Sequence, residues 1–423
     1  MTSPERKLAA MELTERARVA SRALATSTSD QRARALRLFA DQLGSPEVAS
    51  AIAAANEADL RAAAGAGKNA AFIDRLRIDG KRLAALATAV RDVANLPDPV
   101  GEVVEHSVRP NGLRVDRVRA PLGVILMIYE SRPGVTSDAA ALCLRSGNAV
   151  LLRGGSEALQ TSSVLLEACQ RALEAAGLPE DAAQIVPPDR QLLDEMLQLE
   201  DSIDLCIPRG GPSLIRFIAE RSRIPVIKHY QGVCHLYVAP DADLDLAARL
   251  TVDGKAERPG VCNALECLLV DAQIASDALP RIAGAVRARG VELRADERAL
   301  RILGSAAIPA TADDFGKEFL DLKLAVAVVD GIEGAIGHIA RYGSRHTEAI
   351  CTKDGELAER FLREVDASCV VWNASTRFND GGELGLGAEI GISTSKLHAY
   401  GPMGLRELTC TRFVVRGEGQ VRK

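Results

Sequence analysis

Short apolar runs bounded by glycine or charged residues alternate with longer amphipathic segments along most of this chain. GVILMIYE (residues 123–130), AVLLRGG (149–155) and DLCIPRGG (204–211) have the length of buried strands, and a segment with helical apolar spacing follows each of them. Strands that alternate with helices across short loops form parallel sheets covered by helices on both faces. The pattern predicts an α/β fold built on doubly wound parallel sheets.

The same alternation restarts near residue 240. Apolar strands are expected at ECLLVD (266–271), LAVAVVD (324–330), EAICT (348–352) and CVVWN (369–373), with helical segments between them. A chain of 423 residues is also too long for one ordinary core. We therefore expect two α/β units that face each other across a ligand-binding cleft.

Two segments differ from this alternation. The first 95 or so residues carry helical apolar spacing, as in QRARALRLFADQL (31–43) and KRLAALATAVRDVANL (81–96). Residues 102–121 alternate in strand fashion around Pro-Asn-Gly, which is the strongest hairpin signal in the chain. We expect an N-terminal helical region followed by a β-hairpin.

The bulk composition narrows the function classes. The chain has 52 basic and 57 acidic side chains, a formal net charge of −5 and no long basic block, which argues against nucleic acid as the main partner. The first residues lack the apolar core of a signal peptide, and no apolar run reaches the ~18 residues of a membrane span. The nine cysteines have scattered spacings without a C-x-x-C pair, so the disulfide and zinc-finger patterns are weak. A cytoplasmic protein is expected.

Two loops place glycine beside arginine where predicted strands end. These loops consist of Arg153, Gly154, Gly155 and Ser156, and of Arg209, Gly210 and Gly211. A helix N-terminus attracts anions through its free N–H groups and its dipole, and a guanidinium adds a fork suited to phosphate. Glycines that merely permit a tight turn would explain either loop alone, but two such loops favour phosphate binding. The chain has neither a P-loop nor a G-x-G-x-x-G motif, so a dinucleotide would bind without the usual signatures.

Patterns that resemble metal sites are incomplete. DADLD (241–245) starts like a calcium loop but lacks the later glycine and glutamate of that motif. Cys234 and His235, taken with His229, fit no standard ligand spacing. We expect no bound metal.

Cys262 differs in its surroundings from the other cysteines. It lies in KAERPGVCNALE (255–266) behind a Pro-Gly turn, so an irregular exposed loop is expected there. Lys255 and Arg258 would favour its thiolate form. Free cysteines are usually buried, and those within helix or strand patterns are expected to serve packing: Cys143, Cys169, Cys267, Cys351 and Cys369. The pattern favours a thiol nucleophile beside a phosphate-binding fold.

Several strings together resemble the gamma-glutamyl phosphate reductases, also called glutamate-5-semialdehyde dehydrogenases, a family of the aldehyde dehydrogenase superfamily. These strings are YESRPGVTSDAAALCLRSGNAVLLRGGSEA, DLCIPRGG, IPVIKHYQGVCHLYV, KAERPGVCNALE, NASTRF and GLGAEIGISTSKLH with GPMGL. They occur in the right order from about residue 100 to the C-terminus. The chain departs from the usual strings at Gly134 and Asp253, where Asn is common, and at Tyr400, where Arg is common.

The resemblance implies an aldehyde dehydrogenase-like fold and a reaction of proline biosynthesis. In that reaction NADPH reduces L-glutamyl 5-phosphate to L-glutamate 5-semialdehyde, and phosphate is released. A homo-oligomer is implied, and a separate glutamate kinase is the expected transient partner. The implied domains are an NADP(H)-binding domain (1–101 and 122–235), an oligomerisation arm (102–121 with 385–423) and a catalytic domain (236–384).

The resemblance also implies roles for single residues. Cys262 falls on the family's nucleophile, the two glycine–arginine loops fall where the superfamily holds its cofactor, and Glu318 resembles a ribose-binding glutamate. The backbone N–H of Cys262 and the Asn263 side chain would stabilise the oxyanion. Because the substrate carries a carboxylate and a phosphate, candidates for binding it are Arg132, Arg258, Ser375 and Arg377.

The expected chemistry uses a thioester. Hydride cannot reduce a carboxylate directly, whereas a thiolate at Cys262 would expel phosphate from an acyl phosphate and leave a reducible thioester. Aldehyde-oxidising relatives hydrolyse their thioester with a glutamate in a Glu-Leu-Gly-Gly string, but here HYQGVCH (229–235) has Gln231 and Gly232 and no carboxylate. Two alternatives stay open. One is NAD(P)-dependent oxidation of another aldehyde, and the other is a cysteine acyltransferase or hydrolase without nicotinamide.

Overall fold

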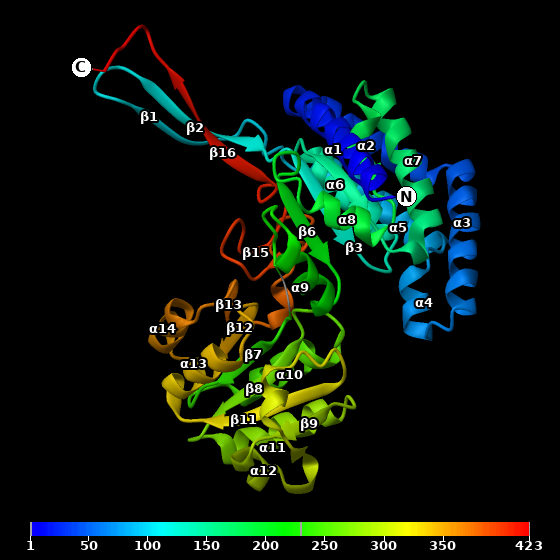
Figure 1. Ribbon diagram of the computed structural model, residues 1–423. Coiled ribbons are helices and arrows are strands. Elements are labelled where there is room, and N and C mark those ends of the chain that lie inside the picture. Colours follow the sequence, from blue (N-terminus) through cyan, green and yellow to red (C-terminus); the bar gives the residue numbers. More distant parts are fainter. Residues whose placement is uncertain (1, 229–230, 423) are drawn as a thin grey trace. The chain divides into compact units, whose positions relative to one another are not determined.

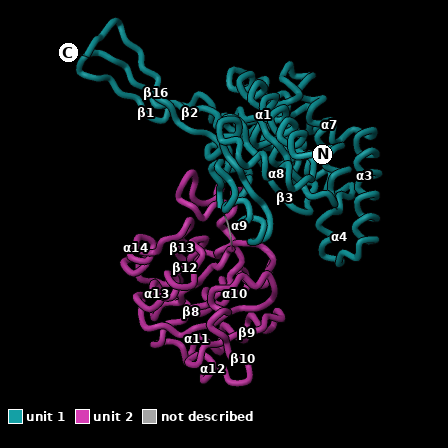
Figure 2. Tube along the Cα trace, in the orientation of Figure 1, with its two compact units in different colours: residues 1–228, 386–391, 403–423 teal, residues 229–385, 392–402 magenta. Residues whose placement is uncertain are grey.

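The chain divides into two compact units. The computed structural model describes residues 2–228 and 231–422. Unit 1 comprises residues 1–228, 386–391 and 403–423, and unit 2 comprises residues 229–385 and 392–402 (Figure 2). Each unit contains one parallel sheet, which is the pattern that the alternating segments predict. The assignment of cofactor binding and catalysis to separate domains remains a prediction.

The N-terminal region of unit 1 is helical, as predicted. Its helices are α1 (Ser3–Thr26), α2 (Ser29–Gly44), α3 (Pro46–Gly65), α4 (Ala70–Leu76) and α5 (Gly80–Asn95) (Figure 1). Capping side chains fix several of the starts: Thr28 and Gln31 form a capping box at α2, and the Asp79 carboxylate accepts the backbone N–H of Arg82 at α5. Helix α2 packs against α5 and against α7 (Leu159–Ala175), which follows later in the chain.

The sheet of unit 1 has four parallel strands in the order β5-β4-β3-β6. The strands are β3 (Val124–Tyr129), β4 (Ala149–Arg153), β5 (Ala183–Ile185) and β6 (Leu205–Arg209). The helices that follow them are α6 (Gly134–Arg145), α7 (Leu159–Ala175), α8 (Arg190–Met196) and α9 (Pro212–Arg221). All six residues of β3 are buried, because the strand lies in the middle of a sheet covered on both faces.

An antiparallel ribbon extends from the rest of unit 1 (Figure 1). The predicted hairpin forms β1 (Val103–Val108) and β2 (Arg114–Pro121), and Gly112 supplies the positive φ of 85° in its turn. A third strand, β16 (Thr409–Arg416), pairs with β2 along its whole length. The sequence analysis did not predict this strand, because the pairing joins segments almost 300 residues apart.

Unit 2 contains seven parallel strands in the order β10-β9-β11-β8-β7-β12-β13. The strands are β7 (Cys234–Val238), β8 (Leu265–Asp271), β9 (Glu292–Ala295), β10 (Ile308–Pro309), β11 (Lys323–Val329), β12 (Thr347–Cys351) and β13 (Cys369–Trp372). The helices are α10 (Leu244–Ala256), α11 (Ala275–Arg287), α12 (Glu297–Leu303), α13 (Gly331–Tyr342) and α14 (Gly355–Glu364). A short ladder joins β14 (Ile392–Ser393) and β15 (Gly401–Pro402).

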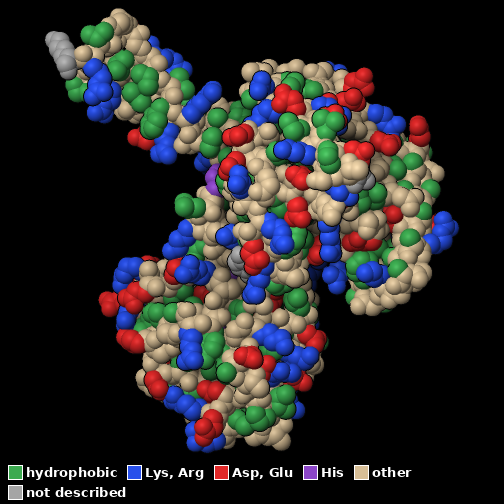
Figure 3. All heavy atoms as spheres, in the orientation of Figure 1, with side chains coloured by type: hydrophobic (Ala, Val, Ile, Leu, Met, Phe, Trp, Pro, Cys, Tyr) green, Lys and Arg blue, Asp and Glu red, His purple; other side chains and the backbone are tan. Residues whose placement is uncertain are grey.

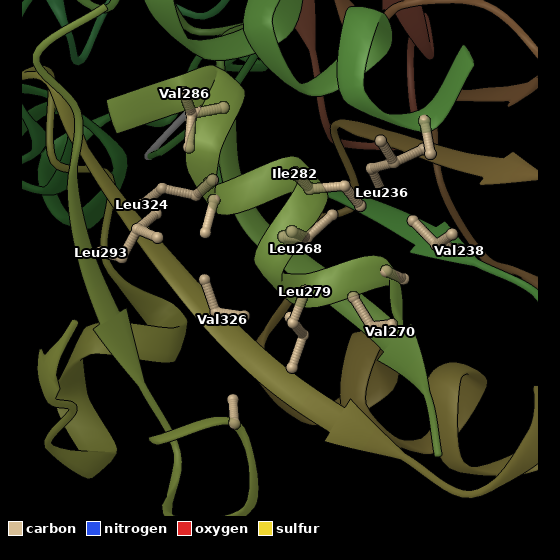
Figure 4. Packing of buried hydrophobic residues seen from close by; sticks show 14 of the residues in the cluster. Leu236, Val238, Leu268, Val270, Leu279, Ile282, Val286, Leu293, Leu324 and Val326 are labelled. Carbon is tan, nitrogen blue, oxygen red and sulfur yellow. The ribbon is translucent and has the colours of Figure 1, made fainter. Parts of the chain in front are cut away.

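Alternate residues of strands β7, β8, β11 and β12 in unit 2 enter two different cores. Leu268 and Val270 of β8 pack with Leu279 and Ile282 of α11 on one face (Figure 4). Cys267 and Leu269 point to the other face, which α13 and α14 cover. Both cores consist mainly of Ala, Val, Leu and Ile, as the aromatic content of 3% predicts. Among the described residues, no helix combines the length and apolar character needed to cross a bilayer.

Candidate active site

Both glycine–arginine loops of unit 1 lie at the carboxyl end of its sheet. Arg153 ends β4 and Arg209 ends β6, and these strands flank β3 on either side. Gly211 is the N-cap of α9, as predicted. The other loop differs, because a 3-10 turn over Ser156–Ala158 separates its glycines from α7. The carboxyl end of a parallel sheet is where such folds bind ligands, so the placement suits a cofactor site.

Two carboxylates that the sequence analysis did not select lie against these loops. Glu157 Oε1 accepts the backbone N–H of Ser131 at 3.1 Å and its hydroxyl at 2.9 Å. Glu130 Oε2 accepts the N–H of Gly211 at 3.1 Å. A Cβ at Gly155 would come within 2.3 Å of Glu157, and one at Gly210 within 2.6 Å of Glu130. The absence of a side chain at these glycines therefore leaves room for the two carboxylates.

The arginines of these loops have distinct surroundings. Arg153 is half-buried, burial lowers its pKa, and its Nε has no hydrogen-bond partner among the described residues. Arg209 lies near Asp138. Burial raises the pKa of Asp138 to about 6, although the positive charge of Arg209 acts to lower it. Arg132 is exposed at the start of the segment that leads into α6. Arg153 is therefore the guanidinium best suited to meet an anion at this end of the sheet.

Cys262 lies in the turn between α10 and β8 and is partly exposed. The cysteines predicted to serve packing lie in helices or strands, as expected. Burial raises the pKa of the Cys169 thiol to about 12, which makes it unreactive. The fully buried cysteines are Cys143, Cys169, Cys206, Cys234, Cys267 and Cys351. The exposure of Cys262 and its irregular backbone are the features that a nucleophile needs.

The backbone of Cys262 is held by the segment that precedes β7. Cys234 Sγ donates to the Cys262 carbonyl at 3.3 Å. Gly232 also packs on this carbonyl, because a Cβ at position 232 would lie 1.9 Å from the Cys262 oxygen. Burial raises the pKa of Glu318. The backbone N–H of Gly232 donates a hydrogen bond to the Glu318 carboxylate, which lowers this pKa in part. Glu318 is thereby placed close to the loop of the predicted nucleophile.

Asn263 joins this loop to the NASTRF segment. Its Nδ2 donates to the carbonyls of Arg377 at 3.2 Å and Asn379 at 3.0 Å, and its Oδ1 accepts from the Arg377 guanidinium. Thr376 Oγ1 donates to the Asn263 carbonyl at 2.8 Å. Ser375 is buried and caps the turn at Thr376–Phe378. Both amide hydrogens of Asn263 are engaged, so these contacts position the loop, and its role as an oxyanion donor remains a prediction.

Lys255 and Arg258, both expected to favour the thiolate, have different surroundings. Arg258 is exposed. Lys255 is fully buried, and its Nζ lies 2.6 Å from Glu266 Oε2, which is also fully buried. Glu266 Oε1 in turn accepts the N–H of Leu320 at 3.4 Å. The Lys255 ammonium group therefore forms an ion pair with Glu266. Through its second oxygen, Glu266 also connects the segment after Glu318 to β8.

The three departures from the family strings lie at separate places. Gly134 begins α6, where a Cβ would come within 3.2 Å of Leu86. Asp253 is exposed on α10. Tyr400 Oη donates to Asp366 at 3.4 Å. His229, one of the three side chains weighed as metal ligands, lies outside the described residues.

Replacing Gly232 by alanine is expected to lower kcat/KM by about 100-fold. The new methyl group would overlap the Cys262 carbonyl and displace the loop by up to about 1 Å, which misplaces the nucleophile. Steady-state assays of the variant give the measurement. Gly284→Ala is the matched control, since α11 leaves open space at that position. Native kinetics in Gly232→Ala would show that this contact does not set the position of the loop.

Comparison with known proteins agrees with this arrangement. The aldehyde dehydrogenase family profile matches residues 5–301. A gamma-glutamyl phosphate reductase from Anaeromyxobacter sp. (strain K) is 59% identical over 414 residues, which cover 97% of this chain and 96% of that protein. One from Xanthomonas axonopodis pv. citri (strain 306) is 57% identical over 375 residues, which cover 88% of this chain and 90% of that protein.

The crystal structure of a gamma-glutamyl phosphate reductase from Thermotoga maritima superimposes with a TM-score of 0.95 at 42% identity, covering 98% of this chain and 100% of that chain. The predicted fold class and the predicted family are therefore confirmed. The chain belongs to the aldehyde dehydrogenase family and, within it, to the gamma-glutamyl phosphate reductases, which are oxidoreductases.

Proposed function

We propose that the protein reduces L-glutamyl 5-phosphate to L-glutamate 5-semialdehyde with NADPH and releases phosphate, as a step of proline biosynthesis. The thiolate of Cys262 attacks the acyl carbon, the bond to phosphate breaks, and the acyl group stays on sulfur as a thioester. A bound reduced nicotinamide supplies the hydride that turns the thioester into the aldehyde and regenerates the thiolate. The partly exposed thiol of Cys262 and the 59% identity to a named reductase support this assignment.

The contact between Gly232 and the Cys262 carbonyl is the observation that carries the proposal. A hydrolytic aldehyde dehydrogenase needs a carboxylate near its thioester to activate water. Here no side chain fits at position 232 against the loop, and the preceding residue is Gln231. A thioester formed at Cys262 would therefore meet no general base from this segment. The lack of a base in this segment supports phosphate release over acid release.

The residues of unit 1 fit a nicotinamide dinucleotide. Glu130 and Glu157 can accept hydrogen bonds from ribose hydroxyls, and the buried, unpartnered Nε of Arg153 can donate to a phosphate oxygen. The remaining candidates for this role are Gly154, Gly155, Ser156, Arg209, Gly210 and Gly211, with Glu318 from unit 2. We propose Arg132, Arg258, Ser375 and Arg377 as substrate ligands because the substrate is anionic. A preference for NADPH would appear as a higher kcat/KM with NADPH than with NADH.

The arm is proposed to join subunits. Several of its large apolar side chains are exposed in the single chain, and Figure 3 shows hydrophobic side chains along it. Exposed apolar groups on a thin ribbon are typical of protein–protein contact surfaces. Those on the strands of the ribbon include Val103, Val108, Phe413 and Val415. A glutamate kinase remains the proposed transient partner, since the acyl phosphate is labile.

The reverse reaction tests the chemistry directly. Glutamate 5-semialdehyde and NADP should give NADPH only when inorganic phosphate is present, because phosphate must attack the thioester. NADPH formed equally without phosphate would indicate oxidation of the aldehyde to an acid. Turnover of a thioester substrate without any change in NADPH absorbance would indicate an acyltransferase or hydrolase. Either result would overturn the proposal.

A further inference from the structure

A row of polar side chains crosses one face of the unit 2 sheet. Cys267 on β8 and His235 on β7 are register partners, and Glu348 on β12 is the partner of His235 on the other side. All three side chains are buried. Their neighbours on the same face are apolar or aromatic, and include Tyr237, Leu269, Ala325, Ile339 and Ile350. Three polar groups aligned across an apolar core require an explanation, because burying them is unfavourable unless they are paired.

A fourth polar side chain reaches the row from the covering helix. His338 on α13 lies with its ring centroid 5.5 Å from that of His235. The rings of Phe315 and Tyr342 pack around His338 at 5.3 and 4.7 Å. The nitrogen and sulfur atoms of His235, Cys267 and His338 all lie within 4.8 Å of one another. Three soft or borderline donors therefore converge beside two aromatic rings.

The two imidazoles leave nitrogen atoms without partners. His235 Nε2 and His338 Nδ1 are buried and have no hydrogen-bond partner in residues 2–228 and 231–422. The Cys267 thiol lies within hydrogen-bonding reach of His235, but a thiol is a weak hydrogen-bond partner and leaves the buried ring poorly satisfied. A cation that accepts the lone pairs of both rings removes this cost.

Glu348 orients His235 as metal sites require. Its Oε2 accepts from His235 Nδ1 at 2.8 Å and from the backbone N–H of the same residue at 3.0 Å. This bond leaves Nε2 turned toward the other two donors. A carboxylate on the far nitrogen of a ligating histidine fixes the ring and increases its basicity. The bare Gly343 makes room for the carboxylate, since a Cβ there would lie 3.0 Å from Glu348 Oε1.

We propose that His235, Cys267 and His338 form a zinc site inside unit 2, with Glu348 as the carboxylate that orients His235. Two imidazoles and one thiolate are a ligand set that Zn²⁺ prefers, and a water molecule would be the fourth ligand. Binding releases the thiol proton of Cys267 to solvent. Tetrahedral zinc places its ligand atoms about 3.5 Å apart, so side-chain shifts of around 1 Å complete the site.

The loop around Cys234 and His235 fits no metal spacing, because the ligands come from two adjacent strands and a helix. The expectation of no metal rested on this loop and on the incomplete calcium-loop pattern at 241–245, both of which are local in the sequence. Cys267 and His338 are respectively 32 and 103 positions beyond His235, so only the fold brings them together. The proposed zinc site does not involve the thiol of Cys262 and does not depend on the proposed reductase activity.

Cobalt titration of the full chain tests the proposal. The protein is prepared without a histidine tag, stripped with a chelator, kept reduced and titrated with Co²⁺. We expect one equivalent to bind with a thiolate-to-cobalt charge-transfer band, which Zn²⁺ then removes. Cys267→Ser should abolish the band, and His338→Gln should weaken binding at least tenfold. Glu348→Gln should weaken it by about 10–100-fold, as loss of an orienting carboxylate does.

Matched variants separate this site from other metal ligands. His106→Gln on the exposed arm and Cys169→Ser in α7 should bind Co²⁺ as the native chain does. Circular dichroism and thermal unfolding show which variants fold, and His338→Gln alters only a half-buried helix position. A native chain without the band at saturating Co²⁺ would overturn the proposal. So would a band that survives Cys267→Ser and disappears in Cys262→Ala, because the ion would then sit on the predicted nucleophile.

Discussion

Cys262→Ala is expected to lower kcat by at least about 10⁴-fold while the affinity for NADPH stays within a factor of a few. The reason is that the substitution removes the sulfur to which the acyl group is transferred, and no other described cysteine takes its place in this turn. The predicted cofactor loops belong to unit 1 and retain their sequence. Fluorescence titration of NADPH and the phosphate-dependent assay measure the two quantities separately.

A covalent adduct provides the complementary measurement. Acid quenching of the native protein with substrate, in the absence of NADPH, should leave a glutamyl group on Cys262 that peptide mass spectrometry identifies. Cys410→Ala is the matched control, because Cys410 is an exposed thiol on β16 and should be dispensable. Turnover that persists in Cys262→Ala, or an adduct on a different cysteine, would remove Cys262 as the nucleophile.

Local periodicity is enough to predict the two parallel sheets and the hairpin. Each central strand is a run of buried apolar residues such as Val124–Tyr129, and each lies between segments with helical spacing. The partner of the hairpin is not local. Strand β16 pairs with β2, and its sequence alone does not indicate which edge it joins. Register between distant segments is set by tertiary packing, so a single sequence carries little signal for it.

The candidate site shows the same division between local and distant information. The irregular, partly exposed turn at Cys262 could be predicted from its Pro-Gly neighbours, and the resemblance to the family selects it further. Glu130 and Glu157 could have been found, because each lies within three residues of a predicted loop or strand end. The engagement of Asn263 by Arg377 and Asn379 could not, since it depends on a contact across more than 100 residues.

The buried pair of Lys255 and Glu266 gives the second large effect. Glu266→Ala is expected to lower the free energy of unfolding of unit 2 by about 3–5 kcal/mol, because the ammonium group is left buried without a counter-charge. Burial lowers the pKa of Lys255 and raises that of Glu266 to about 7, so burial disfavours both charged forms. The opposite charge of the partner stabilises each of them. The only tryptophan, Trp372, lies on β13, and its fluorescence reports the unfolding of unit 2 in urea.

A control pair and a double variant show whether the loss comes from buried charge. Asp321→Ala breaks the exposed pair with Lys323, whose Nζ lies 2.8 Å from the Asp321 carboxylate, and should cost less than about 1 kcal/mol. Replacing both buried partners, as Lys255→Met with Glu266→Leu, should recover most of the stability, because neither charge then remains. The double variant should still be less active than the native enzyme, since Leu320 loses the acceptor that holds the segment after Glu318. A double variant as unstable as Glu266→Ala would instead assign the loss to packing volume around β8.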